Sequence, residues 1–438
     1  MILAASIPDA KRKRYRLLAY VSAWTGCMSE VLFDSSAVVL LLLAVLGASE
    51  SLTMLTTAFS PIAWSFLMLP CAELARRRGL KWSISAGCYC AMAGCFLAAA
   101  SPWFGRAAVP VAVLGCAVFA LSRPVHLAAW YPLLNGFLRR EERGGFFGFM
   151  RFSYQMIAMA FFFGIGLVMG KKPPVWMLQG VIAFCGILLL GRKLAVDHVP
   201  AIRAAASAES GFRTHLRATV RNGALMSFAV YCCGISFACS ASLPLTILYL
   251  KKELCLGSGA VQIIAVAGTA GTMLGYLCFG RLLAKLRVRR LLVGSHLGII
   301  LTTAGLALCI PQFRITPVLC AVFLFGLHFS VSCFTNCFST EMLALAAPGQ
   351  QTMSAAICSA YNSFGGAVGR FSVSLALGGG MLAAAWDCAG LSFSRFQTLE
   401  LVCSGVALFL LVVLPTVPAI VPHREDYYDG GERSAVTK

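Results

Sequence analysis

Several ionisable side chains lie inside long apolar stretches of the sequence, where a charge is costly to bury. Glu30 and Asp34 are four residues apart, and Arg123, His126 and Trp130 follow one another at helical spacing in a later stretch. Residues three or four positions apart share one face of a helix. Charged groups in membrane-spanning helices usually face the bundle interior or a watery cavity. We therefore expect these five residues to line a pathway for a polar solute or for protons.

Glu30 and Arg123 are expected to lie at similar depths. At about 1.5 Å per residue, Glu30 is about 22 Å and Arg123 about 18 Å from the inner ends of their predicted helices. We therefore expect Glu30 and Arg123 to be in contact and to form a pair that responds to substrate or to protons. The alternative is a permanent ion pair that only fixes helix packing. Asp34 could equally be an interfacial carboxylate, and His126 a satisfied core histidine.

The second half of the chain carries its own polar groups within apolar stretches. His328, Ser332 and Asn336 share one helix face, and Arg370 lies between two glycine clusters. A buried, unpaired arginine is implausible, so Arg370 is expected to meet water, substrate or an acid. Arg151 lies near the end of its stretch and is expected to extend to the cytoplasmic surface. His328, Asn336 and Arg370 complete the predicted pathway.

The composition is that of an integral membrane protein. Of 438 residues, 59% are hydrophobic and only 12% are charged, against about 25% in soluble proteins. The net charge of +19 comes from short basic clusters between apolar stretches, which argues against nucleic-acid binding. The 19 cysteines lie mostly in apolar stretches and lack metal-site spacing. With no nucleotide-binding loop either, we expect no enzyme activity, no cofactor and no metal.

The apolar stretches predict an all-α protein, because lipid offers no partner for free backbone groups. Each stretch reaches the length needed to cross a bilayer. Twelve transmembrane helices are expected, near 15–41, 51–75, 82–102, 107–134, 146–169, 174–191, 221–249, 258–284, 290–310, 315–344, 353–382 and 396–417.

The distribution of Lys and Arg sets the expected orientation. Most of them fall in the two tails and in alternate loops, which the positive-inside rule places in the cytoplasm. Both termini are therefore expected inside a plasma or inner cell membrane. Repeated landmarks predict two pseudo-symmetric six-helix bundles. The expected division is a first bundle at 1–191, a linker at 192–220, a second bundle at 221–417 and a tail at 418–438.

Two basic loops and a third short segment resemble motifs of the major facilitator superfamily. The first loop, 72–81, matches the pattern G-x-L-x-D-R-x-G-R-R at Leu74, Arg77, Gly79 and Lys81, but has Arg76 at the acidic position. Its second-half counterpart has Ala284 there. Glu142-Arg143-Gly144 is similar to the loop after span 4. The resemblance implies that spans 1, 4, 7 and 10 line a central cavity. It also implies a gating motif made of Glu73, Arg76, Arg77, Gly79, Lys81, Gly280, Lys285, Arg289 and Arg143.

The resemblance implies a monomeric secondary active transporter that works by alternating access. Its expected partners are a small polar solute, protons in a proton-coupled symport, and the lipid bilayer. The missing acids imply an altered gate, for which Glu73 is a possible substitute only if its helix ends differently. The alternatives are a drug or metabolite efflux antiporter, a non-transporting solute sensor and a lipid flippase.

Overall fold

The computed structural model describes residues 7–135, 137–138, 143–199, 212–346, 351–388 and 390–414. The described segments are almost entirely helical, as the apolar stretches predict. A single two-stranded hairpin, which the sequence analysis did not anticipate, is the exception within these segments. The predicted tail at 418–438 lies outside the described residues.

The first half of the chain forms a bundle of seven α-helices and one short 3-10 helix. Their bounds follow the predicted spans closely at most ends, and two helices, α1 and α2, share the first span. The elements are α1 (Asp9–Asp34), α2 (Val38–Val45), α3 (Glu50–Arg78), α4 (Leu80–Ala100), η2 (Ser101–Ala107), α5 (Ala108–Asn135), α6 (Arg143–Met169) and α7 (Val175–Asp197).

The second half begins after a short connecting helix, α8 (Phe212–Val220). Its helices are α9 (Gly223–Cys239), α10 (Ser242–Lys252), α11 (Ser258–Ala307), α12 (Thr316–Leu345), α13 (Gln351–Gly378) and α14 (Arg395–Val413). Between the last two, β1 (Ala385–Cys388) pairs antiparallel with β2 (Leu391–Ser394), with Ala385 opposite Ser394.

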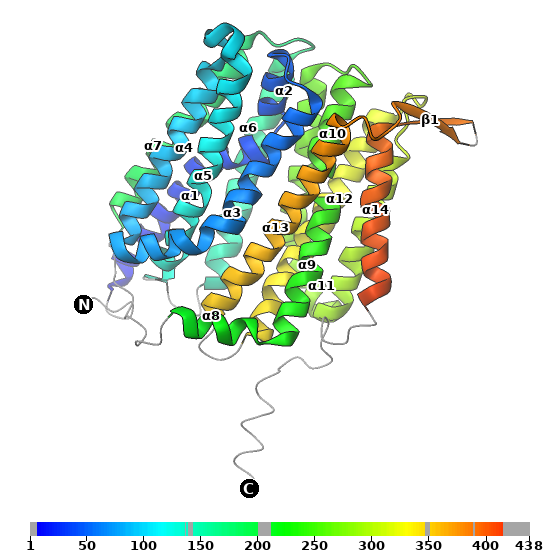
Figure 1. Ribbon diagram of the computed structural model, residues 1–438. Helices are drawn as coiled ribbons and strands as arrows, with labels where there is room; N and C mark the ends of the chain where they lie inside the picture. Colours follow the sequence, from blue (N-terminus) through cyan, green and yellow to red (C-terminus); the bar gives the residue numbers. More distant parts are fainter. Residues whose placement is uncertain are drawn as a thin grey trace.

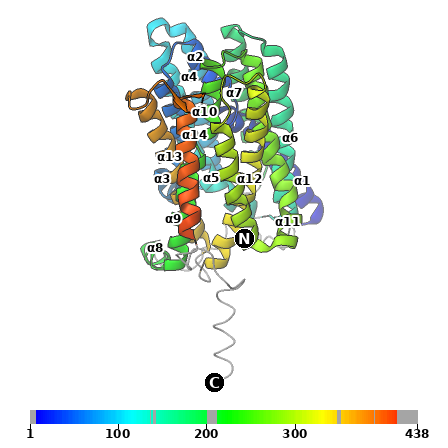
Figure 2. The ribbon, with the colours of Figure 1, turned by 90° about the vertical axis from the view of Figure 1, so that its right-hand side faces the viewer.

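The two halves stand side by side, with α1–α7 in blue to cyan and α9–α14 in green to red (Figure 1). Helix α8 lies across one end of the molecule, and the β hairpin projects at the opposite end (Figures 1 and 2). We call these ends the linker face and the hairpin face. Helix α1 begins and α14 ends at the linker face, as an even number of crossings requires.

Nine helical stretches of the described chain are long and apolar enough to cross a membrane. The bent pair α1–α2 makes a tenth, with an angle of 46°. Helices α4 and α5 share one of the nine, Leu80–Leu134, and α11 contributes two, Ser258–Leu283 and Val288–Ala307. With the more polar α13, the predicted twelve transmembrane helices are all present.

The break between α9 and α10 has a cause in the sequence. Pro244 has no N–H to donate to the carbonyl of Ser240, four residues earlier, and its ring crowds that carbonyl. Helix α9 therefore stops at Cys239 and α10 starts at Ser242. The seventh predicted span is thus two helices, and the carbonyl of Ser240 at the break lacks its helical donor.

The halves are joined closely at the hairpin face. Helix α6 meets α11 where a Cβ on Gly259 would come within 2.5 Å of the carbonyl oxygen of Gly166, so only glycine fits. The amide of Gly259 donates to the carbonyl of Gly170 at 2.7 Å. Helix α3 meets α13 through Ser51, whose hydroxyl donates to the carbonyl of Ser374 at 2.8 Å. These contacts hold the two halves together at that end.

Candidate functional site

Four charged side chains meet inside the first half, on three different helices. Arg123 of α5 contacts both acids of α1, with 3.1 Å from Nη1 to Glu30 Oε2 and 3.1 Å from Nη2 to Asp34 Oδ2. Arg192 of α7 approaches the other oxygen of Glu30, with 2.7 Å between Nη1 and Oε1. The predicted contact between Glu30 and Arg123 is therefore present. We call Glu30, Asp34, Arg123 and Arg192 the charge cluster.

Local sequence explains how Arg192 reaches so deep. A Cβ on Gly26 would lie 1.5 Å from Arg192 Nε, so the guanidinium passes over α1 only because residue 26 is glycine. The carbonyl of Ser22 accepts a hydrogen bond from Arg192 Nε at 3.3 Å. Gly26, Ser22 and Glu30 lie at four-residue steps along α1, on one face. The side chain of Arg192 therefore lies along that face of α1.

The charge cluster is electrically balanced, with two acids and two guanidinium groups. Burying such charges is costly, and the cost is recovered only with close pairing and extra hydrogen bonds. Arg123 and Arg192 are 11% and 8% exposed, whereas Asp34 is 34% exposed. Asp34 is thus the member most open to solvent.

His126 and Trp130 lie next to the charge cluster but make no ion pair with it. The His126 ring is buried and stacks on Trp130, with 5.5 Å between ring centroids, and its Nδ1 has no hydrogen-bond partner. His126 also lines a small cavity of about 10 Å³, room for about one water molecule, with Glu30, Arg123 and Arg192. The cavity lies within the first half, between α1, α4, α5 and α7. His126 therefore shares a small cavity with three members of the charge cluster.

Arg370 bridges the two halves instead of meeting an acid. Its Nη1 donates to the carbonyl of Thr57 on α3 at 2.5 Å, and its Nε donates to the carbonyl of Ser240 at 3.1 Å. Both carbonyls stand four residues before a proline, Pro61 or Pro244, and so have no helical donor. Arg370 supplies the hydrogen bonds that the two prolines remove.

Arg151 does not extend to the surface as expected. It turns toward the second half, where it stands over the Tyr276 ring of α11 at 5.6 Å and its Nη1 lies 3.5 Å from Asn336 Oδ1 on α12. The partners are neutral, so the side chain lies over the interface without an ion pair to a described residue. His328, on the same helix as Asn336, pairs with Thr272 of α11 at 3.3 Å. These second-half residues are not in contact with the charge cluster.

The sequence analysis missed Arg192, which it placed at the start of the linker. Helix α7 instead continues to Asp197, which forms an ion pair with Lys193 at 2.8 Å, one turn apart. That i, i+4 pair was the available signal, because it favours continuation of the helix past the apolar stretch. The apolar stretch alone gave no such indication, since it ends at residue 191.

Comparison with known proteins settles the family. The sequence profile described as Major Facilitator Superfamily matches residues 19–370, most of the chain. The chain belongs to the major facilitator superfamily. It is therefore a multi-pass membrane protein, and the resemblance drawn from its motifs is confirmed. No curated protein matches the sequence.

Solved structures of this superfamily share the fold. A D-xylose-proton symporter aligns with a TM-score of 0.72 at 12% identity, covering 92% of this chain and 96% of the other. The nucleoside transporter NupG aligns at 0.67 and 14%, covering 92% and 98%. A bacterial homologue of the iron transporter ferroportin, in an inward-facing state, aligns at 0.67 and 12%, covering 92% and 98%. At such low identities the likeness concerns the fold alone.

The superfamily's loop motif shows how this member differs. Gly79, at φ 99°, makes the turn between α3 and α4, a conformation that favours glycine. Glu73 pairs with Arg77 at 2.6 Å on the exposed end of α3, and Lys81 Nζ donates to the carbonyl of Asp197 at 2.8 Å. Glu73 therefore engages an arginine of its own loop.

The remaining motif residues are less informative. Gly280, Lys285 and Arg289 are exposed on α11. The side chains of Arg76, Arg143 and Ala284 lie outside the described part of the structure.

Proposed function

We propose that the protein is a secondary active transporter that moves a small polar solute by alternating access. Its superfamily and its two side-by-side helical halves support this class of function. The observation that carries the proposal is the charge cluster, in which Arg123 is shared between Glu30 and Asp34. Ionisable groups at this depth of a membrane bundle commonly mark a substrate or ion pathway.

Sharing one guanidinium between two acids provides a route to proton coupling. A solute that binds Arg123 competes with Glu30 and Asp34 for its donors. Arg192 still neutralises Glu30 at 2.7 Å, so Asp34 is the acid that loses its only ion-pair partner in the described structure. Loss of a neighbouring positive charge makes a carboxylate easier to protonate. Solute and proton would then move together, as a symport.

The two faces would open in turn. The close contacts between the halves at the hairpin face support a state that is closed there. If the protein lies in a plasma or inner cell membrane with its linker face on the cytoplasmic side, this state would exchange solute with the cell interior. A monomer contains both halves that this cycle requires, and no enzyme activity enters it.

Efflux antiport, solute sensing and lipid flipping are the alternatives on the same scaffold. A sensor would bind solute but show no counterflow in proteoliposomes. An antiporter would export the solute in exchange for protons that enter down their gradient. A flippase would move labelled lipid between leaflets without a water-soluble substrate. The same reconstituted protein therefore separates all four functions.

The decisive experiment begins with a panel of small polar solutes tested by thermal shift on the purified protein. Flux of any stabilising solute is then measured in proteoliposomes with and without a pH gradient. We expect accumulation to follow the gradient, and Glu30→Gln and Asp34→Asn to weaken that dependence. Asp387→Asn, at an exposed site on β1, is the control and should behave as wild type. If both substitutions left uptake and its pH dependence intact, proton coupling at the cluster would be rejected.

A further inference from the structure

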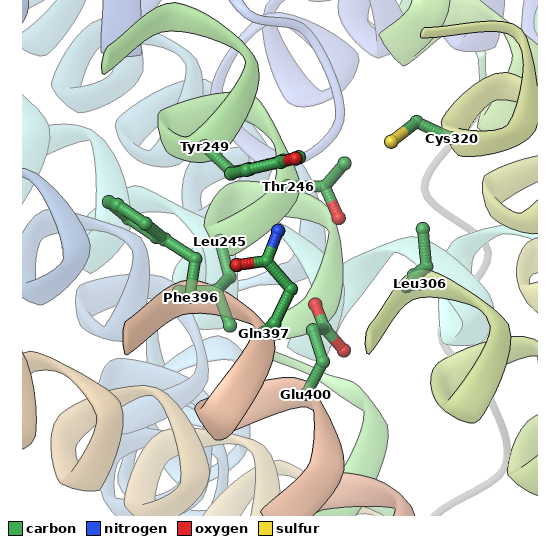
Figure 3. A pocket seen from close by; sticks show the side chains of 8 residues that line it. All are labelled: Leu245, Thr246, Tyr249, Leu306, Cys320, Phe396, Gln397 and Glu400. Atoms are coloured by element: carbon green, nitrogen blue, oxygen red, sulfur yellow. The ribbon is translucent and has the colours of Figure 1, made fainter. Parts of the chain in front are cut away.

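A second buried acid lies in the other half of the molecule, far from the charge cluster in sequence. Glu400 of α14 is only 3% exposed. Its Oε2 accepts a hydrogen bond from the hydroxyl of Ser242 at 2.8 Å, whereas its Oε1 is buried with no hydrogen-bond partner. Figure 3 shows its side chain pointing from α14 into a pocket, on the same side as Gln397.

No described residue that lines the pocket around Glu400 carries a positive charge. The pocket is a small cavity of about 10 Å³, room for about one water molecule, and is lined mainly by apolar and neutral polar side chains. None of the ion pairs in the described residues involves Glu400. The titratable groups around Glu400 are thiols and a phenol: Tyr249 of α10, Cys239 at the end of α9, Cys320 of α12 and Cys403 of α14. An ionised Glu400 would therefore be stabilised mainly by one serine hydroxyl.

Burial of an isolated carboxylate in such a setting is very unfavourable. A proton on Oε1 removes the charge and leaves Oε2 free to accept the same bond from Ser242. The orphaned Oε1 is thus the atom at which a proton removes the charge, and the neutral O–H that results costs much less to bury than the ionised carboxylate. The acid can gain or lose that proton without breaking an ion pair.

Ser242 connects this acid to the broken helix. It is the first residue of α10, two positions after Ser240, whose carbonyl receives Arg370. One end of the α9–α10 break is thus held by Arg370, which also reaches Thr57 in the other half, and the other end is held by Glu400. Ionisation of Glu400 calls for water or a positive charge in the pocket. Movement of α10 at the break is the nearest way to admit it.

We propose that Glu400 is a proton-binding site of the second half, and that its loading is coupled to the bend between α9 and α10. The site is separate from the charge cluster of the proposed function. The proton is bound while the hairpin face is closed. It leaves when α10 moves and opens the pocket to water.

Infrared spectroscopy of the full-length protein in lipid vesicles tests the site directly. Wild type should show the carbonyl band of a protonated carboxylic acid that disappears as pH rises and shifts in heavy water. In Glu400→Gln the intensity of this band should fall by the contribution of one carboxyl group. Ser242→Ala keeps Glu400 but removes the donor that stabilises its carboxylate. In this variant the midpoint of the Glu400 band should rise by about one pH unit.

Two results would overturn the proton site. The Glu400 band could be missing at every pH at which the protein is folded, which would mean an acid that is always ionised. Alternatively, the band could persist unchanged throughout, which would mean a permanently protonated packing residue.

The coupling to the helix break has its own readout. Spin labels placed at Trp103 and Cys255, on opposite halves near the hairpin face, report the opening of that face. Their separation should change with the same midpoint as the band in wild type and lose that pH dependence in Glu400→Gln. An unchanged separation in wild type would refute the coupling. A titrating band in a protein that moves no solute would reject the proposed transport while leaving the proton site standing.

Discussion

The two halves of the molecule bury a glutamate in opposite ways. Glu30 in the first half meets two guanidinium groups, from Arg123 and Arg192, within 3.1 Å. Glu400 in the second half accepts a hydrogen bond from one hydroxyl, and its other oxygen has no hydrogen-bond partner. The first arrangement keeps the charge and compensates for it, whereas the second is stable when the charge is absent. One residue type is therefore compensated by two guanidinium groups in one half and has a single hydroxyl donor in the other.

The difference follows from the neighbours that each helix brings. Helix α1 carries glycine at position 26, which admits Arg192 of α7, and its Glu30 is also reached by Arg123 of α5. Helix α14 lies beside α10 and α11, whose nearby residues, such as Thr246 and Leu306, are neutral. The comparison predicts that substitutions in the charge cluster destabilise the protein far more than substitutions at Glu400.

The largest effect is expected for Arg192→Met. It leaves the cluster with two acids and one base, and removing one partner of a buried pair typically costs about 3–5 kcal/mol. Adding Glu30→Gln restores the charge balance, so the double variant should recover much of that loss. Denaturant unfolding of the purified protein measures both. A double variant no more stable than Arg192→Met would show that charge balance is not what the cluster provides.

A smaller effect is expected for Arg370→Met. It leaves the carbonyls of Thr57 and Ser240 without donors, and because both bonds are only partly buried, we expect a combined loss of about 1–3 kcal/mol. Because one of these carbonyls belongs to the other half, the loss should favour opening at the hairpin face. The distance between labels at Trp103 and Cys255 should increase. Arg395→Gln, which removes the partly exposed ion pair with Glu50, is the matched control and should change stability by under about 1 kcal/mol.

The smallest effect is expected for Glu400→Gln. The amide oxygen can still accept from Ser242, and no ion pair is broken, so the change in unfolding free energy should stay within about 1.5 kcal/mol. The same denaturant series that compares Arg192→Met with wild type provides the scale. A loss as large as that of Arg192→Met would mean that Glu400 is ionised and compensated, and the contrast between the halves would fail.

Much of the architecture could be predicted from the sequence, because hydrophobic length and basic loops depend on local composition. The predicted spans overlap the observed helices throughout the described chain. The contact between Glu30 and Arg123 could also be anticipated, since residue counting gives depth in a helix that crosses a slab. The breaks at residues 35–37 and 240–241 and the β hairpin were not anticipated.

The partners of individual polar groups were beyond such reasoning. Counting gives the depth of Arg370 but not the fact that two prolines free the carbonyls that it binds. Arg151 looked like a surface residue, but it turns toward Tyr276 because α6 packs against α11. Side-chain direction across an interface depends on helix rotation, and rotation is set by packing between helices distant in sequence.

The sequence by itself determined a twelve-helix membrane protein with acids and arginines at membrane depth, because apolar length and charge position are properties of the chain. Only the tertiary structure decided which of those charges are paired. Arg192 joins Glu30 because Gly26 leaves room for it, and Glu400 stands without a cation because α10, α11 and α14 bring none to it. Charge compensation depends on a few ångströms between separate helices, and that spacing exists only in the folded protein.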